Sequence, residues 1–228
     1  GALNSIVLDG NLLTGTQRQG YGYAETTCDV QIDGFKALCD ALAPSQIREI
    51  SLKSCWLGPQ AVVLLADAIN FMGALTEVNV AFNQIGSDGG IALRDALKTS
   101  NLKFLAIGMM YTSNGGTVIT GSQLTTGVTL SAGGRLGELI SGPDSGLNVK
   151  LRWADDGKES DRMKLHSLDG EPLKLPLQSP FEGEHLDLAH QQLDPGHIVI
   201  LAWWLTTEFS GALNSVTVDS TGDTKDPR

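Results

Sequence analysis

The sequence predicts an α/β fold built from repeated strand–helix units, with parallel strands inside, helices outside and a small all-β module inserted. Three observations lead to this fold class. One apolar pattern occurs four times before residue 111, apolar residues at helical spacing follow two of its copies, and short alternating stretches begin after residue 127. A single strand–helix unit buries its apolar side only against a neighbour, so the units are expected to stack as a solenoid.

The repeated pattern is Leu-x-x-Leu-x-Leu-x-x-Asn-x-Leu. Copies that begin at residues 47, 75 and 102 are 28 and 27 residues apart, which is within the spacing of leucine-rich repeats. The chain therefore resembles the leucine-rich-repeat family, and in particular its ribonuclease-inhibitor-like class, which places a helix on the outer face of each repeat. The four copies comprise Leu3, Ile6, Leu8, Asn11 and Leu13; Ile47, Ile50, Leu52, Cys55 and Leu57; Leu75, Val78, Val80, Asn83 and Ile85; and Leu102, Leu105, Ile107 and Met110.

Helices are predicted after the second and third units, where apolar residues recur at steps of three, four and seven. These residues are Val62, Leu65, Ala66 and Ile69, then Leu93, Ala96 and Leu97. Two weaker units follow near the C-terminus. The fifth has Leu186, Leu188, Gln191, Leu193, Leu201 and Leu205, and the sixth has Leu213, Val216 and Val218. Gly-Ala-Leu-Asn-Ser occurs at both Gly1 and Gly211.

Neither the first nor the last unit has the polar cap that terminal repeats of a solenoid normally carry. We therefore expect a section of a longer protein, or else ends that a partner covers. The first interpretation is the favoured one.

Two insertions interrupt the repeats. Residues 14–33, with Gly20, Tyr21, Gly22 and Tyr23, are predicted to form a surface loop, which either carries contacts or has no role. After a Gly/Thr/Ser-rich linker at 112–127, the predicted short strands span 128–130, 135–140, 147–153 and 161–165. The resulting division is 1–111 for leucine-rich repeats, 112–180 for the linker and β module, and 181–228 for further repeats.

The β module resembles an SH3-like barrel with the signature Gly-x-Val…Val-x-Trp-x-Asp-Gly. The resemblance rests on Gly134-Arg135-Leu136-Gly137 and on Val149-x-Leu151-x-Trp153 followed by Gly157. Similar units occur beside leucine-rich repeats in protist proteins, those of dinoflagellates in particular, and barrels of this type generally bind proteins. Leu136 replaces the usual Val, and Asp155 and Asp156 precede Gly157, so no peptide-binding residue is carried over.

Composition limits the classes of function. With 228 residues and 41% hydrophobic content, the chain can bury a substantial core. Its apolar runs are far shorter than the ~20 residues that span a bilayer. The net charge of −10 argues against nucleic acid and anionic membranes as partners. This charge is uneven, because residues 125–176 hold 7 basic and 8 acidic residues and the rest holds 9 and 18.

The three cysteines form neither an even framework nor a Cys-x-x-Cys motif. Cys39 and Cys55 are expected to be inert core thiols, and Cys28 a loop thiol. This usage fits a reduced, intracellular setting, cytoplasmic by default, with an organelle also admissible.

We find no motif for catalysis or for a bound cofactor. Gly133 to Gly137 and Ser113 to Gly116 lack the Lys-Ser/Thr of a P-loop and are interpreted as turns. The segment from Asp219 to Asp223 is similar to a phosphoaspartate loop but has a serine in place of its basic residue. A solvated polar surface is favoured over a metal site for His185, His190, His197, Glu182, Glu184 and Asp187.

The predicted function is a non-catalytic protein–protein interaction scaffold that uses the concave strand face of the repeats. A basic or polar protein partner is expected, because acidic residues outnumber the single Lys53 on this face. The predicted partner-binding residues are Asp9, Glu49, Ser51, Lys53, Glu77, Asn79, Phe104, Asp187, Trp203 and Asp219. All of these except Trp203 are expected on the concave face, which also includes Ser5, Val7, Ala81, Ala106, Gly108, His185, Ala189, Ser215 and Thr217.

Trp203 is included because the equivalent outer-helix position in earlier repeats is occupied by an aspartate, namely Asp40, Asp67 or Asp95. Tryptophan is enriched where surfaces meet, so Trp203 is expected to be covered. The inserted module or its linker is the preferred candidate for covering Trp203. Another protein is the second alternative, and an uncovered Trp203 is the third.

Two other classes of function remain open. One is a structural accessory subunit that is permanently bound in a large assembly, which an organelle could house. The other is a regulatory segment of a larger enzyme.

Overall fold

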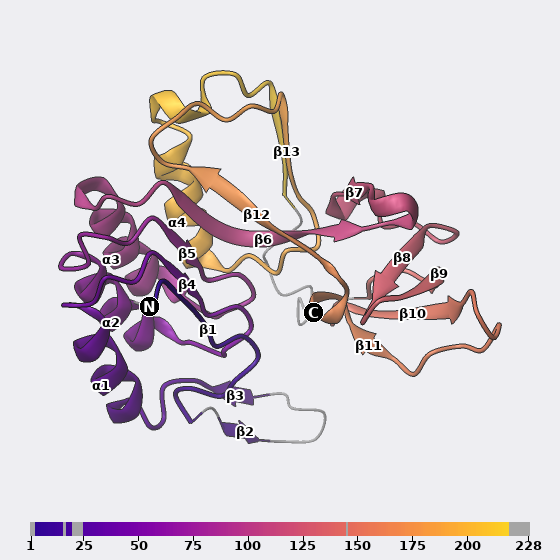
Figure 1. The fold of residues 1–228 in the computed structure, drawn as a ribbon, viewed down its shortest axis with the longest axis horizontal. Helices are drawn as coiled ribbons and strands as arrows, with labels where there is room; N and C mark the ends of the chain where they lie inside the picture. The colour runs from indigo at the N-terminus through magenta and orange to yellow at the C-terminus, as the bar shows by residue number, and fades with distance from the viewer. Residues whose placement is uncertain (1–2, 16, 20–24, 145, 219–228) are drawn as a thin grey trace, which may run out of the picture. The chain divides into compact units, whose positions relative to one another are not determined.

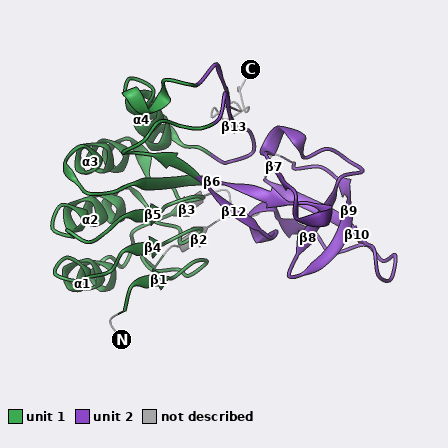
Figure 2. Cartoon of the chain, turned by 45° about the horizontal axis from the view of Figure 1, so that its top comes forward, with its two compact units in different colours: residues 1–107, 174–182, 193–212 green, residues 108–173, 183–192, 213–228 purple. Residues whose placement is uncertain are grey.

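The computed structural model describes the chain except for residues 1–2, 16, 20–24, 145 and 219–228. The chain divides into two compact units (Figure 2). The first unit comprises residues 1–107, 174–182 and 193–212, and the second comprises 108–173, 183–192 and 213–228. Each unit thus combines three segments that are separate in the sequence, whereas the prediction was three domains that follow one another along the chain.

Parallel strands form one layer of the first unit. They are β1 (Ser5–Val7), β4 (Glu49–Ser51), β5 (Glu77–Asn79) and the start of β6 (Phe104–Thr112), paired in that order. Successive side chains of a strand point to opposite faces, and Ile50, Val78 and Leu105 meet in register on the buried one. The protein is therefore mixed α/β with partly parallel sheets, as predicted.

Four helices pack in a row against one another (Figure 1). They are α1 (Asp33–Leu42), α2 (Pro59–Ile69), α3 (Gly86–Thr99) and α4 (Pro195–Trp204). The residues predicted to form the buried helix faces are buried in the structure, namely Val62, Leu65, Ala66, Ile69, Leu93, Ala96, Leu97 and Leu201.

The prediction for Leu205 is wrong. Helix α4 ends at Trp204, and Leu205 follows as its C-cap with 40% of its surface exposed. The neighbouring Trp204 is fully buried, and its indole N–H donates to the Pro176 carbonyl at 2.7 Å.

The side chain at the Asn position of each repeat makes polar contacts with the neighbouring repeat. The buried Asn83 amide donates to the Leu52 carbonyl at 2.8 Å, and its oxygen accepts from the Leu57 N–H at 3.0 Å. Cys55 has this position one unit earlier, and its thiol donates to the Leu8 carbonyl at 3.1 Å. Each side chain therefore ties its own unit to the preceding strand.

The first insertion forms an antiparallel pair of β2 (Gln17–Gln19) and β3 (Glu25–Thr27). Residues 20–23, with the predicted Gly and Tyr, lie outside the described part. The returning chain places the Asp29 carboxylate at the start of α2, where it accepts the Gly58 amide at 3.0 Å. The insertion therefore caps a helix as well as forming a hairpin.

The second unit contains an antiparallel sheet of four strands. Their order is β11 (Met163–Lys164), β10 (Asn148–Trp153), β9 (Arg135–Ser141) and β8 (Thr129–Ala132), close to the predicted positions. Val149 and Leu151 are buried and Arg152 is exposed, which confirms the alternation predicted for β10.

The remaining described strands form three further pairings, and four short helices complete the described elements. Strand β7 (Val118–Ile119) pairs with the end of β6, and β13 (His185–Leu188) pairs in parallel with β14 (Ser215–Val218). Strand β12 (Gly170–Pro176) runs beside β6. The 3-10 helices are η1 (Asn114–Gly116), η2 (Gly121–Gln123), η3 (Leu165–Ser167) and η4 (Glu208–Ser210).

Gly133 and Gly134 make the turn between β8 and β9, with φ of 58° and 77°, a region that side chains disfavour. Their amides donate to the Asp169 carboxylate at 3.0 and 2.8 Å, and the Ser131 hydroxyl donates to it at 2.6 Å. This confirms the interpretation of the glycine motif as a turn.

Asp194 caps two helices at once. Its Oδ1 accepts from the Gly196 amide of α4 at 3.0 Å, and its Oδ2 accepts from the Gly86 amide of α3 at 2.7 Å. Burial alone would raise the pKa of this carboxyl, but the hydrogen bonds from His197 and Gly86 outweigh it and hold the pKa below its ordinary value.

We expect Asp194→Ala to lower the free energy of unfolding at pH 7 by about 2 kcal/mol, because two helix ends lose a cap. A depressed folded-state pKa stabilises the protein above the unfolded pKa of about 3.9, and this stability is lost as the pH falls through the folded value. Urea unfolding between pH 7 and pH 2 should therefore show a smaller acid loss in Asp194→Asn than in the wild type. The control is Asp67→Asn on the exposed side of α2. An acid loss that Asp194→Asn leaves unchanged would contradict this assignment.

Candidate interaction surface

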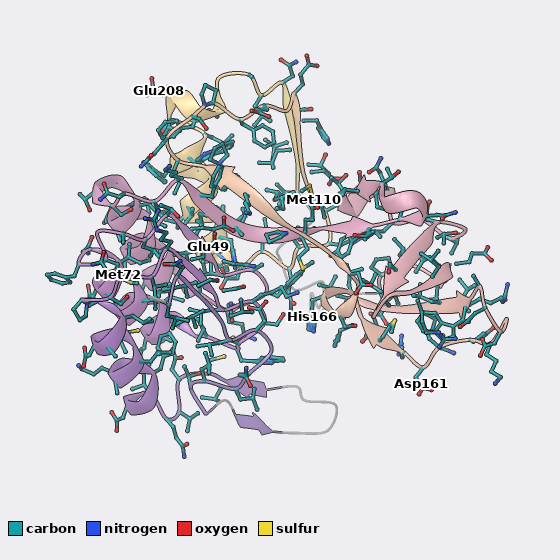
Figure 3. All side chains as sticks on the ribbon, viewed as in Figure 1. Glu49, Met72, Met110, Asp161, His166 and Glu208 are labelled. Atoms are coloured by element: carbon teal, nitrogen blue, oxygen red, sulfur yellow. The ribbon has the colours of Figure 1, made fainter. Side chains whose placement is uncertain are left out.

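The first unit presents a surface that we call the strand face, on the side of the strands opposite the core. It consists of two rows that follow the strand register. One row contains Ser5, Glu49, Glu77 and Phe104, and the other contains Val7, Ser51, Asn79 and Ala106. Glu49 lies on the strand side of the unit and Met72 on the helix side (Figure 3).

Exposure of the strand face decreases from β1 to β6. Val7 is 66% exposed, and Ser5 and Glu49 are also exposed. Asn79 is only 5% exposed, and Ala106 is fully buried. The open half of the face therefore lies over β1 and β4.

Two carboxylates are direct neighbours on this face, because Glu49 and Glu77 are register partners. Lys174 lies 2.7 Å from the Glu77 carboxylate, and its ammonium is 5.7 Å from the centre of the Phe104 ring. Within the described residues, the Glu49 carboxylate makes no hydrogen bond or ion pair. The charge of Glu77 is thus compensated by Lys174, whereas no described residue compensates the charge of Glu49.

Three of the predicted residues meet at the edge of the open half. The Ser51 hydroxyl donates to Asp9 Oδ1 at 2.6 Å, and the Lys53 amide donates to the same oxygen at 2.9 Å. Asp9, Ser51 and Lys53 are all half-buried. Asp9 therefore holds β1 against the chain that follows β4, in addition to lining the surface.

The prediction that Asn79 and Asp187 are open to a partner is wrong. The Asn79 side chain is buried and accepts the Ala81 amide at 3.1 Å. Asp187 is 2% exposed, and it accepts the amides of Ser122 at 2.8 Å and Ala189 at 3.0 Å. These side chains accept hydrogen bonds from turns inside the protein. Strand register alone does not distinguish such a buried side chain from one that is open to solvent.

Burial raises the pKa of the Asp187 carboxyl, but hydrogen bonds led by that from the Ser122 hydroxyl outweigh it, so the net pKa lies below its ordinary value. Asp187 therefore stays ionised while buried, as an acceptor for the η2 turn.

Trp203 was predicted to lie on an outer helix and to be covered, and Asp219 was predicted on the strand face. Trp203 is half-buried in α4, seven residues after Gly196, and so lies on the side of the helix that packs on α3. Asp219 lies outside the described residues.

The histidines have separate local roles. His197 is buried and forms a capping box with Asp194 at the start of α4. The His185 ring lies 2.7 Å from the Ser215 hydroxyl and 3.4 Å from the Thr217 hydroxyl. Among the described residues, no three of His, Cys, Asp and Glu are arranged to hold a metal ion.

Two of the thiols are buried, as predicted. Burial raises the pKa of Cys39 to about 12 and that of Cys55 to about 11, so neither is a thiolate at neutral pH. Cys28 is half-buried, and its thiol lies 3.4 Å from the Gln84 side-chain oxygen.

An apolar groove of about 370 Å³, which the sequence did not predict, lies on the helix side. Its lining comes from α1, α2 and the residues that begin α3, at helix positions that the core pattern leaves out. The lining residues are Ile32, Lys36, Pro59, Gln60, Val63, Leu64 and Asp88.

No protein-family model matches the chain, and no curated protein matches it significantly. In the described part of the chain, no helix has both the length and the apolar character that crossing a membrane requires.

The Lys174–Glu77 contact should couple the two residues by roughly 0.5–1 kcal/mol, because it is partly shielded from water. Urea unfolding of Lys174→Gln, Glu77→Gln and the double variant measures this coupling, which 1 M salt should reduce. In the Lys174→Gln background, Glu49→Gln should recover stability, since it removes a like-charge neighbour. Zero coupling, or no recovery by Glu49→Gln, would contradict the electrostatic description of this row.

Proposed function

We propose that the chain is a non-catalytic protein–protein interaction scaffold, a leucine-rich-repeat solenoid with an inserted SH3-like barrel. The parallel strand register and the row of outer helices support the solenoid, and the antiparallel four-stranded sheet supports the barrel. The partner binds the open half of the strand face.

The observation that carries this proposal is the Glu49 carboxylate, which lies between exposed Ser5 and the Lys174-paired Glu77 and has no counter-charge in the described part of the chain. A partner with a lysine or arginine at this point would supply the missing positive charge. Val7 on the adjoining row offers apolar contact area beside that charge. Such complementarity sets the rate and specificity of association.

The chain itself supplies an example of this recognition. Lys174 reaches the strand face with its ammonium on the carboxylate of Glu77 and near the ring of Phe104. The aliphatic stem of a lysine can lie along apolar surface while its charge stays at a carboxylate. The partner is therefore a basic protein segment with aliphatic or aromatic neighbours.

The test begins with affinity capture and mass-spectrometric identification of a stoichiometric partner. Its dissociation constant for the wild type is then compared with that for Glu49→Lys by titration calorimetry. We expect a loss of at least ~tenfold for Glu49→Lys, weakening at high salt, because a favourable charge pair becomes a repulsion. Asp67→Lys, the same charge change on the outer side of α2, is the control and should bind as the wild type does. Equal binding by Glu49→Lys would exclude the strand face as the binding surface.

A structural accessory subunit is the second candidate. Leu3, a core position of the first repeat, is 64% exposed, which favours a permanent cover over a transient one. Native gel electrophoresis of the endogenous protein separates the two functions. A subunit migrates in one complex of fixed stoichiometry, whereas a transient scaffold is released on dilution.

A further inference from the structure

Helix α4 has an apolar side that is only partly buried. Between Pro195 and Trp204 it contains no Lys, Arg, Asp or Glu. Ile198 is half-buried, Ala202 is exposed and Leu205 is 40% exposed, and their spacing of four and then three residues aligns them along one side of the helix. We call these three residues the α4 stripe.

The α4 stripe lies opposite the contact between α4 and α3. Gly196 marks that contact, because a Cβ there would lie 2.1 Å from the Gly86 carbonyl oxygen. At 100° per residue, Ile198 and Leu205 fall about 160–180° from Gly196 around the helix. The stripe is thus on the side where a further helix would continue the row from α1 to α4.

The sequence that follows α4 indicates which helix would fit there. The segment beginning at Gly211 repeats Gly1-Ala2-Leu3-Asn4-Ser5, and it keeps apolar residues where the first copy has Ile6 and Leu8. Each helix of the row packs on the helix that precedes it in the chain: α2 on α1, α3 on α2, and α4 on α3. The helix that follows the first copy of this strand is α1. A helix like α1 is therefore the natural continuation of the row beyond α4.

Helix α1 has a matching face on the side away from α2. Lys36 lies on the α2 side, because it lines the groove together with α2 residues. The other side contains Gly34, Ala37, Leu38 and Ala41, of which only Leu38 is half-buried and the rest are exposed. These four residues form the α1 stripe. Its small side chains leave room for Ile198 and Leu205, in the way that the glycines between α3 and α4 permit close approach.

We propose that a second copy of this chain docks its α1 stripe on the α4 stripe. The contact joins two different surfaces, so it is head-to-tail and leaves a free stripe at each end of a dimer. Longer assemblies grow until they close or until the protein is diluted. This interface uses neither Glu49 nor the strand face, so it stands independently of the proposed function.

Analytical ultracentrifugation of the purified full chain across micromolar to millimolar concentrations tests this proposal. The wild type should associate with increasing concentration. Leu205→Glu on the α4 stripe and Ala41→Glu on the α1 stripe should each raise the dissociation constant at least ~tenfold, because a carboxylate would be buried without a partner. Phe71→Glu is the matched control, since Phe71 is 75% exposed in the turn after α2, outside both stripes. It should associate as the wild type does.

Mixing the two variants provides the decisive measurement. Leu205→Glu retains its α1 stripe and Ala41→Glu retains its α4 stripe, so an equimolar mixture should form a dimer that cannot grow further. Circular dichroism confirms that each variant is folded, and Ala202→Glu replaces Leu205→Glu if the latter is not. A wild type that stays monomeric at millimolar concentration overturns the proposal. Association that both variants leave intact, or a mixture that remains monomeric, overturns it as well.

Discussion

The buried amide of Asn83 is the interaction on which the first unit depends. It donates to the carbonyl of Leu52, in the preceding strand–helix unit, and accepts the amide of Leu57. The strands here are only three residues long, so their ladder hydrogen bonds cannot by themselves hold the turns beyond them. The side chain satisfies backbone groups that burial would otherwise leave unpaired, at a cost of about 1–3 kcal/mol each. Register, and with it the two rows of the strand face, follows from this fixed turn.

Much of the architecture could be predicted because periodicity reports burial. Helix residues such as Leu65 and Leu93 are buried where a 3.6-residue period places them, and strand residues such as Val149 where a two-residue period does. The exceptions are polar residues at strand ends. Asp187 has the spacing of an outward residue, yet it is buried because Ser122, far away in the sequence, supplies its hydrogen bonds. A pattern of apolar positions contains no information about such a partner.

The candidate surface shows the same limit. Register alone puts Glu49 beside Glu77, and the sequence was sufficient for that. It was not sufficient to identify Lys174 as the counter-charge, because 97 residues separate it from Glu77 and no repeat position corresponds to it. The difference between the two glutamates is a tertiary property, because Glu77 pairs with Lys174 and Glu49 pairs with no described residue. The cap of α2 is likewise supplied by Asp29, which lies outside that helix, and Asp194 caps both α3 and α4. A local capping motif in the sequence reveals neither arrangement.

The antiparallel pairing of β6 with β12 has a consequence for residues 113–168, which lie between the two paired strands in the chain. The Thr112 N–H donates to the Asp169 carbonyl at 2.9 Å, and the Leu177 N–H donates to the Lys103 carbonyl at 2.8 Å. The two ends of residues 113–168 are therefore already closed by a ladder that lies outside them. Loop-closure entropy grows only slowly with length, so the ladder would tolerate segments of very different size at this point. A short reverse turn joining Thr112 to Asp169 directly would remove β7 from this sheet but leave the path from β1 through β4, β5 and β6 to β12 unbroken.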